Sequence, residues 1–421
     1  MPAISTHMGK YRWRVVVLLF FATTINYIDR QILGMLKPFI GNDLELTEAS
    51  YGYIVSAFQA AYAIGLLFVG IIIDKYGTKI SYAIAVVIWS LAACLHAVAG
   101  SAFGFGIMRF FLGIGESANF PAAIKSTAEW FPKKERALAT GIFNSGSNMG
   151  AILAPVIVSV VTIAYGWKWA FIITGLLGFI WVIFWLLFYR LPKDSPRLSK
   201  AEYDYIHEDD KDEGTEKSTG MSWIALIRQR QSAGICLARF ICDWVWWFFL
   251  FWTPDFLNKT YGVDIMQMVM PLIIIYAFAA LGGVFGGSIS SMLINRGKSV
   301  SFSRKAALFI CACCVIPVAL IPVIESLWTS VILISIAAFA HQGWASNIYT
   351  VVSDYYPKNA VGSMTGLAGF SGSIGGILAA IFVGQVLEIT KSYFIIFLIA
   401  GCAYVIAFFV LQLFLPKTKK R

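Results

Sequence analysis

Charged residues are scarce in this sequence of 421 residues: they make up 13% of the chain, whereas hydrophobic residues make up 58%. A soluble globular chain is usually about a quarter charged, so this chain has too little polar surface to be water-soluble. Its apolar stretches run to about twenty residues or more, which is roughly the length that spans a bilayer. The composition therefore excludes a soluble protein and indicates one that is surrounded by lipid.

Motifs for enzyme chemistry are also missing. We find no HExxH, GxSxG or phosphate-loop pattern in the sequence. The seven cysteines fall inside or at the edges of apolar stretches without paired histidines, which favours core packing over metal or disulfide chemistry. The sequence therefore argues against an enzyme and predicts neither a metal site nor a cofactor.

The apolar stretches predict twelve membrane-spanning helices. No small-residue cleavage pattern follows the first stretch, so we expect a retained helix rather than a signal peptide. Windows of about 19 residues give the spans. They cover residues 13–34, 52–73, 80–99, 103–124, 136–163, 168–190, 234–260, 269–293, 303–323, 328–351, 361–386 and 391–415. The fold class is therefore an all-α membrane protein.

The net charge of +10 is distributed unevenly along the chain. Most basic residues between the spans fall in segments that are cytoplasmic if the N-terminus is inside. The opposite loops hold only Lys37, Lys168, Lys259 and Lys391. Because cytoplasmic loops of membrane proteins carry an excess of Lys and Arg, we expect both termini in the cytoplasm. This topology accounts for the basic charge without a nucleic-acid partner.

A charged segment separates the first six predicted spans from the last six. It includes the largely acidic run from Glu208 to Glu213. We predict an N-terminal six-helix bundle over residues 1–190, a cytoplasmic linker over 191–233 with a short amphipathic helix near 196–206, and a C-terminal six-helix bundle over 234–421. Two parallel six-helix halves are typical of transporters that bind substrate at mid-membrane.

A loop pattern recurs at matching places in the two halves. The chain reads GIIIDKYGTK from Gly70 to Lys79 and GSISSMLINRGK from Gly287 to Lys298. Glycine allows a tight turn, and acid and base at helix ends can pair across a gate. The candidate gate residues are Gly70, Asp74, Lys75 and Gly77. The first loop resembles the G-x-x-x-D-[RK]-x-G-[RK]-[RK] signature of the major facilitator superfamily and departs from it at Thr78.

Four charged residues lie inside the first and fourth predicted spans: Asp29, Arg30, Arg109 and Glu116. Each costs about 2.5–3.5 kcal/mol at a helix centre and needs a partner or a function. Counting along the helices places Asp29 level with Arg109, so we expect these two to pair. A guanidinium binds carboxylates bidentately, and a partly buried carboxylate can load and release a proton. Arg30 is accordingly the candidate for the substrate carboxylate, and Asp29, Glu116 and Arg109 are the candidates for proton coupling. The alternative is a purely structural ion-pair network.

Neutral polar and aromatic residues dominate the interior of the second half, where Arg239 and Asp243 are the charged exceptions. Aromatic planes beside hydroxyl and amide groups suit a polyol. The candidate substrate-binding residues here are Trp246, Trp247, His341, Gln342, Asn347, Ser371 and Ser373. The tryptophans could instead belong to the lipid belt or to packing, and His341 could be a hydrogen-bonded structural group.

Several segments together resemble the anion:cation symporter family of the major facilitator superfamily, and within it the hexuronate transporters. They are NYIDR at 26–30, YGY at 51–53, the residues from Arg109 to Glu116 and from Ser126 to Arg136, FNSGS at 143–147, Arg239 with Asp243, and FAHQ at 339–342. The resemblance implies that Arg30 contacts the substrate carboxylate and that Tyr27 and Tyr62 line the site. It also links Asp29 and Glu116 to protonation, with Arg109 as their charge partner, and Asn144 is a further substrate candidate.

The resemblance implies a multi-pass transporter of the bacterial inner membrane that takes up glucuronate or galacturonate with protons by alternating access. We expect a monomer that needs the proton gradient rather than a cofactor. The main alternative is an aldonate such as galactonate, or another organic anion. Related aldonate carriers tend to have an amide where this chain has Ser373, whereas the His341–Gln342 pair favours a uronate. A non-transporting nutrient receptor on the same fold is a second alternative, but it would not need paired protonatable groups.

Overall fold

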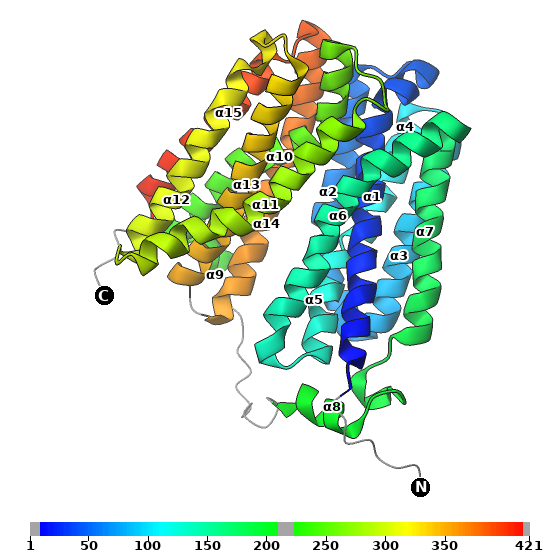
Figure 1. The fold of residues 1–421 in the computed structure, drawn as a ribbon, viewed down its shortest axis with the longest axis vertical. Coiled ribbons are helices and arrows are strands. Elements are labelled where there is room, and N and C mark those ends of the chain that lie inside the picture. Colours follow the sequence, from blue (N-terminus) through cyan, green and yellow to red (C-terminus); the bar gives the residue numbers. More distant parts are fainter. Residues whose placement is uncertain (1–8, 209–222, 357, 416–421) are drawn as a thin grey trace. The chain divides into compact units, whose positions relative to one another are not determined.

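A computed structural model describes residues 9–208, 223–356 and 358–415, and every regular element in these ranges is helical (Figure 1). The first eight α-helices are α1 (Tyr11–Leu44), α2 (Glu48–Tyr76), α3 (Thr78–Leu95), α4 (Ala102–Glu116), α5 (Asn119–Trp130), α6 (Lys133–Tyr165), α7 (Trp167–Phe188) and α8 (Lys200–Ile206). The others are α9 (Trp223–Ile227), α10 (Arg230–Tyr261), α11 (Val269–Asn295), α12 (Val300–Val315), α13 (Leu327–Tyr355), α14 (Lys358–Thr390) and α15 (Phe394–Phe414). The predicted all-α membrane architecture is confirmed.

The predicted span at 103–124 is broken in the structure. Eleven helical stretches within the described residues are long and apolar enough to cross a membrane. The remaining predicted span consists of α4 and α5, which are separated by Ser117 and Ala118. At the break the Ser117 hydroxyl donates to the Ile114 carbonyl at 2.7 Å. Two shorter helices in series therefore replace one continuous helix, and Glu116 ends the first of them.

The chain forms two compact units. Unit 1 comprises Met1–Ile32 and Ala61–Lys217, and unit 2 comprises Leu33–Ala60 and Ser218–Arg421. Helices α1 and α2 thus contribute one part to each unit, whereas the predicted bundles of residues 1–190 and 234–421 assigned both helices entirely to the first half. The domain boundaries read from the sequence stay a prediction.

Helix α1 extends ten residues beyond the predicted end of the first span, from residue 34 to Leu44. The prediction that Lys37 lies in a loop is therefore wrong. Met35, Leu36 and Ile40 are buried, so the apolar side of the helix continues past the predicted end. Pro38 lies inside α1 without ending it. A proline removes one backbone donor, and packing of the surrounding residues outweighs that loss.

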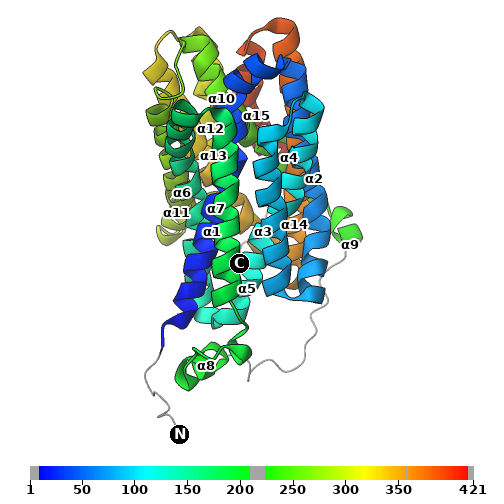
Figure 2. The same cartoon turned by 90° about the vertical axis from the view of Figure 1, so that its right-hand side faces the viewer.

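In unit 1, α3 packs against α4 and α7 (Figure 2). Trp181 and Trp185 of α7 stack on one another with ring centroids 5.0 Å apart, and Tyr82 of α3 lies against both rings. The Trp181 indole also donates to the Leu18 carbonyl of α1 at 2.7 Å. Large aromatic rings with a satisfied polar atom bury much area, so these contacts fix α1, α3 and α7 together.

The predicted short helix of the linker is present as α8. Its Glu202 carboxylate is buried and accepts hydrogen bonds from the backbone N–H groups of Tyr11 and Arg12, both at 3.1 Å. These are the first two residues of α1, so Glu202 satisfies donors that a helix start leaves open. Arg12 also forms ion pairs with Glu202 at 3.1 Å and with Glu135 of α6 at 2.8 Å. Residues 209–213 of the acidic run lie outside the described residues.

Candidate functional site

A buried ion pair joins Arg30 of α1 to Glu116 of α4. Nε and Nη2 of Arg30 both donate to Glu116 Oε2, at 2.9 and 2.8 Å, and both side chains are buried. Nη2 also lies 3.3 Å from Oδ1 of Asn26, one helical turn earlier on α1. Burial of either charge alone would be costly, and the pair neutralises both.

Two tyrosine rings cover the Arg30 guanidinium. Its Cζ lies 4.8 Å from the ring centroid of Tyr27 and 5.0 Å from that of Tyr62. A guanidinium over aromatic faces is attracted by the ring quadrupoles, more strongly where water is excluded. The structure thus brings together Arg30, Glu116, Tyr27 and Tyr62, all of them candidates from the sequence. The group (Arg30, Glu116, Tyr27, Tyr62) is called the arginine site below.

The charges of Asp29 and Arg109 interact, as expected, but no hydrogen bond joins the two side chains. Neither carboxylate oxygen of Asp29 has a hydrogen-bond partner among the described residues. Arg109 instead donates from Nη1 to the backbone carbonyl of Arg30 at 3.4 Å. Asp29 and Arg109 are both fully buried, as their predicted depth requires. The counting of residues gave the shared depth, whereas the direction of each side chain around its helix decides which hydrogen bonds form.

His341 and Trp246 lie together in unit 2. Their rings are parallel within 3°, with centroids 5.2 Å apart, and His341 Nδ1 is hydrogen-bonded to the Tyr404 hydroxyl. Trp247 stacks on Phe251 of the same helix at 5.9 Å. The geometry therefore unites two of the predicted candidates, Trp246 and His341, and gives His341 a structural partner.

Other candidates of the second half donate hydrogen bonds to backbone carbonyl groups. Asn347 Nδ2 lies 2.8 Å from the carbonyls of both Gly286 and Gly343. The hydroxyl of Ser371 donates to the Cys236 carbonyl at 2.8 Å, and that of Ser373 donates to the Gly369 carbonyl at 3.1 Å. Asn347 and Ser371 thus connect their helices to the backbone of a neighbouring helix, whereas Ser373 bonds within α14. Gln342 is half-buried on α13, and Asn144 is exposed on α6.

Arg239 and Asp243 form a second charged pair within the membrane. The Arg239 Nη2 and Asp243 Oδ2 atoms are 2.7 Å apart, one turn along α10. The guanidinium also lies 5.1 Å from the Tyr349 ring centroid. An arginine with a carboxylate and an aromatic ring therefore occurs in both units.

The candidate gate residues Gly70, Asp74 and Lys75 lie in the last turns of α2, and Gly77 lies between α2 and α3. Asp74 forms an ion pair with Lys125 of α5 at 2.6 Å, and Lys75 lies beside the Tyr76 ring at 5.2 Å. Gly77 directly precedes α3 and has a backbone φ of +81°, an angle that residues with a side chain rarely adopt. Gly70 lies near the end of α2 with open space around its Cα.

Thr78, where the loop departs from the family signature, has a partner of its own. Its hydroxyl donates to Glu129 Oε1 at 2.8 Å, and Glu129 also accepts a hydrogen bond from the Tyr189 hydroxyl. Where the family signature has a basic residue, this chain therefore has the neutral Thr78 hydroxyl, which donates to the Glu129 carboxylate. Pairing of the loop across a gate stays a prediction.

The sequence analysis missed a charged cluster in unit 2. Lys37 Nζ lies 2.6 Å from Glu48 Oε2 and 2.7 Å from Asp255 Oδ2, and Lys259 pairs with both carboxylates. Tyr393 donates its hydroxyl to Asp255. The sequence alone places Lys37 and Lys259 in loops, where a lysine needs no partner, whereas the structure places them in α1 and α10. The signal that could have revealed the cluster is the apolar run on both sides of Lys37.

Comparison with known proteins agrees with the fold. The chain matches the model of the Major Facilitator Superfamily over residues 19–380. It is 34% identical to the hexuronate transporter of Escherichia coli (strain K12) over 379 residues, which cover 90% of this chain and 88% of the relative. It is 36% identical to the galacturonate transporter of Dickeya chrysanthemi over 299 residues, which cover 70% of this chain and 86% of the relative.

Solved structures share the fold at low sequence identity. A bacterial homologue of the human lysosomal transporter Spinster, in an inward-facing and occupied conformation, aligns with a TM-score of 0.76 at 19% identity over 97% of both chains. A D-xylose-proton symporter aligns with a TM-score of 0.72 at 17% identity over 97% of this chain and 98% of its own. The helical spans, the signature loop and the match over most of the chain show that this multi-pass membrane protein belongs to the Major Facilitator Superfamily of transporters and is not an enzyme.

Proposed function

We propose that the protein takes up a hexuronate, such as glucuronate or galacturonate, together with protons by alternating access across the bacterial inner membrane. The observation that supports this proposal best is the arginine site, in which a buried guanidinium is held by one carboxylate and two aromatic rings. A guanidinium fork fits a carboxylate bidentately, so the same group can bind a substrate that carries one. We expect the protein to act as a monomer.

Competition between Glu116 and the substrate accounts for coupling. Both Arg30 contacts to Glu116 go to the single oxygen Oε2. A proton on Glu116 removes its negative charge and weakens this pair, so the guanidinium becomes available to the substrate carboxylate. After the substrate leaves, Glu116 loses its proton and pairs with Arg30 again. Arg30 thus has an anionic partner both in the empty carrier and in the substrate-bound carrier, which limits the cost of burying its charge.

Asp29 is the second proposed proton carrier. It is buried, and its polar neighbours are the Thr174 hydroxyl and the charges of Glu116 and Arg109. Burial makes its charged form costly, so a protonated carboxyl is tolerated there. Arg109 contacts the backbone of the next residue, Arg30, so it can position α1 at this level. We propose that Asp29 and Glu116 carry protons and that Arg109 holds the geometry.

The choice of a uronate rests on the relatives and on the rings of unit 2. Relatives named as hexuronate and galacturonate transporters are 34% and 36% identical, a probable galactarate/D-glucarate transporter of Bacillus subtilis is 31% identical, and a D-galactonate transporter of Escherichia coli O6:H1 and a hexuronate transporter of Bacillus subtilis are each 28% identical. The stacked pair of Trp246 and His341 offers an aromatic surface for the apolar face of a sugar ring. A linear aldonate has no such ring.

Uptake into proteoliposomes tests the proposal. Labelled glucuronate, galacturonate and galactonate are supplied with and without an inward proton gradient. We expect the two uronates to accumulate above the external concentration only with the gradient. Preferential accumulation of galactonate would favour the aldonate alternative, and binding without uptake would favour a receptor.

A further inference from the structure

The pair of Arg239 and Asp243 in unit 2 repeats the contact geometry of Arg30 and Glu116 in unit 1. Nε and Nη2 of Arg239 both lie close to the single oxygen Oδ2 of Asp243, at 2.8 and 2.7 Å. The same two nitrogens of Arg30 contact Oε2 of Glu116 at 2.9 and 2.8 Å. The mechanism proposed above assigns a role to the pair of unit 1 and none to the pair of unit 2.

The second pair lies deep in the membrane-spanning part of α10. Asp243 is four residues from the middle of the predicted span 234–260, which is about 6 Å along a helix. Charges inside a span are costly, and apolar side chains in place of a buried ion pair often give equal or greater stability. Packing alone therefore does not explain why a charged pair is found at this depth.

The two pairs differ in their exposure. The side chains of Arg239 and Asp243 are 13% and 14% exposed, whereas those of Arg30 and Glu116 are 4% and 0% exposed. Charged side chains inside a span face the bundle interior or a water-filled cavity. Water can therefore reach Asp243 and exchange a proton with it in the same conformation in which Glu116 is fully buried.

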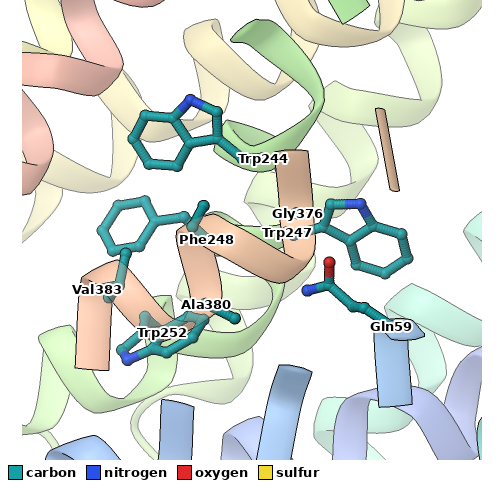
Figure 3. Close-up of a pocket in the computed structure, with 9 residues that line it drawn as sticks. Gln59, Trp244, Trp247, Phe248, Trp252, Gly376, Ala380 and Val383 are labelled. Atoms are coloured by element: carbon teal, nitrogen blue, oxygen red, sulfur yellow. The ribbon is translucent and has the colours of Figure 1, made fainter. Parts of the chain in front are cut away.

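Asp243 is the carboxylate that α10 provides for Arg239. The other acid of this helix is Asp255, twelve residues further on, and it pairs with Lys37 and Lys259. Between the two acids α10 is almost wholly apolar. The rings of this stretch that line a small hollow within unit 2 are Trp244, Trp247, Phe248 and Trp252 (Figure 3). Asp255 is thus separated from Arg239 and has partners of its own.

Neighbouring helices leave Asp243 as the acid beside Arg239. Within the described residues, the other titratable side chains that act on the pair are His341 and Tyr349 of α13, Tyr404 of α15, and Cys236 and Cys242 of α10 itself. In their ordinary state none of these carries a negative charge near neutral pH. Helix α14 comes so close that a Cβ at Gly372 would collide with Oδ2 of Asp243. The carboxylate of Asp243 is therefore the group that can hold a proton at this place.

A proton on Asp243 removes the negative charge that holds Arg239. The Tyr349 ring, whose centroid lies 5.1 Å from the guanidinium carbon, then remains to stabilise the arginine together with water. We propose that Asp243 takes up a proton from the outer side and releases it inside once in each transport cycle, in addition to Asp29 and Glu116. This inference rests on the proposed function, in which protons drive uptake.

The test compares how many protons the wild type and Asp243→Asn couple to each sugar acid. Proteoliposomes are given a pH gradient of about one unit and no membrane potential, and the concentration ratio at which the net flux of labelled glucuronate reverses is measured. Each coupled proton raises this reversal ratio about tenfold under these conditions. Because an amide cannot carry a proton, the ratio should be about tenfold lower in Asp243→Asn. An unchanged ratio with slower flux would assign Asp243 to packing and overturn the inference alone.

Asp354→Asn is the matched control, because Asp354 also pairs with an arginine, Arg304, at 2.9 Å, but lies exposed near the end of α13. It should leave the reversal ratio unchanged. The same tenfold shift in Asp354→Asn would trace the effect to the loss of any ion pair and would also overturn the inference.

A second variant covers the case in which Asp243→Asn does not fold because Arg239 has lost its counter-ion. The double variant Arg239→Gln with Asp243→Asn removes both charges together and carries the same expectation for the reversal ratio. A wild type whose reversal ratio does not respond to the pH gradient would overturn the proposed function as well.

Discussion

Arg30 pairs with the carboxylate of Glu116, and the sequence alone did not predict this pair. Sequence reasoning found both Arg30 and Glu116, because charges inside apolar spans are conspicuous. It missed their direct contact, because residue counting gives the depth of a side chain in the membrane but not its direction around the helix.

Arg30→Lys should abolish most uronate uptake although it keeps the charge. Unlike arginine, lysine has no planar guanidinium. Its ammonium group cannot bind a carboxylate through two parallel hydrogen bonds or stack flat against the tyrosine rings. We expect the KM for glucuronate uptake into proteoliposomes to rise at least about tenfold. A change of this size corresponds to the loss of about one charge-assisted hydrogen bond. Arg197→Lys is the control, since Arg197 is exposed and its guanidinium lies beside the Phe188 ring. Uptake at the wild-type KM by Arg30→Lys would show that the carboxylate binds elsewhere.

Glu116→Gln should separate exchange from accumulation. The amide cannot carry a proton, so uptake against a concentration gradient should be lost, whereas counterflow needs no net proton movement and should persist. Both are measured in proteoliposomes with labelled glucuronate. Glu325→Gln, an exposed substitution of the same type, should change neither. Accumulation that survives in Glu116→Gln would remove Glu116 from the coupling path.

Helix ends were the least predictable elements. The sequence analysis predicted α8 because an amphipathic segment stood out from the charged linker. It ended α1 too early because Lys37 and Pro38 look like loop residues. The pairing of Lys37 with Asp255 comes from residues 218 positions apart, which local patterns cannot reveal.

Removal of Glu202 should loosen the start of α1. Glu202→Ala takes away the acceptor of two backbone N–H groups and one partner of Arg12. Loss of one member of a buried ion pair costs about 3–5 kcal/mol, so the unfolding temperature in detergent should fall by several degrees. Asp204→Ala changes an exposed acid on the same helix and should have little effect. Equal unfolding temperatures for the two variants would contradict this role of α8.

Loss of Lys37 should be compensated by loss of its partner. Lys37→Met leaves Asp255 buried beside Lys259 alone and should lower the unfolding temperature. The double variant Lys37→Met with Asp255→Leu removes both charges, and replacement of a whole buried pair by apolar side chains is often neutral. We expect the double variant to recover most of the lost stability. Additive losses in a double-mutant cycle would indicate that the pair is not energetically coupled.

At the scale of the whole molecule, composition alone was sufficient for the fold class, since few other folds suit a chain with so little charge. Composition and hydropathy were not sufficient to predict the number of continuous spans, because the break after Glu116 depends on local hydrogen bonding. The expected orientation in the membrane rests on the distribution of Lys and Arg.

Reporter fusions check that orientation. A fluorescent protein fused after Arg421 should fluoresce, because both termini are expected in the cytoplasm. Alkaline phosphatase fused after Lys391 should be active, because that loop is expected outside. The opposite pattern would reverse the predicted topology.

The pairing of Arg30 with Glu116 has a consequence for how this sequence can vary. Loss of either residue alone leaves a buried charge without a counter-ion, whereas loss of both removes the charges together. In a library that mutates both positions, the effect of a substitution at one position on folding stability should therefore change sign with the residue at the other position. Such sign epistasis in folding stability would leave the intact pair or its joint loss as the stable combinations, and only the intact pair keeps the proposed carboxylate site.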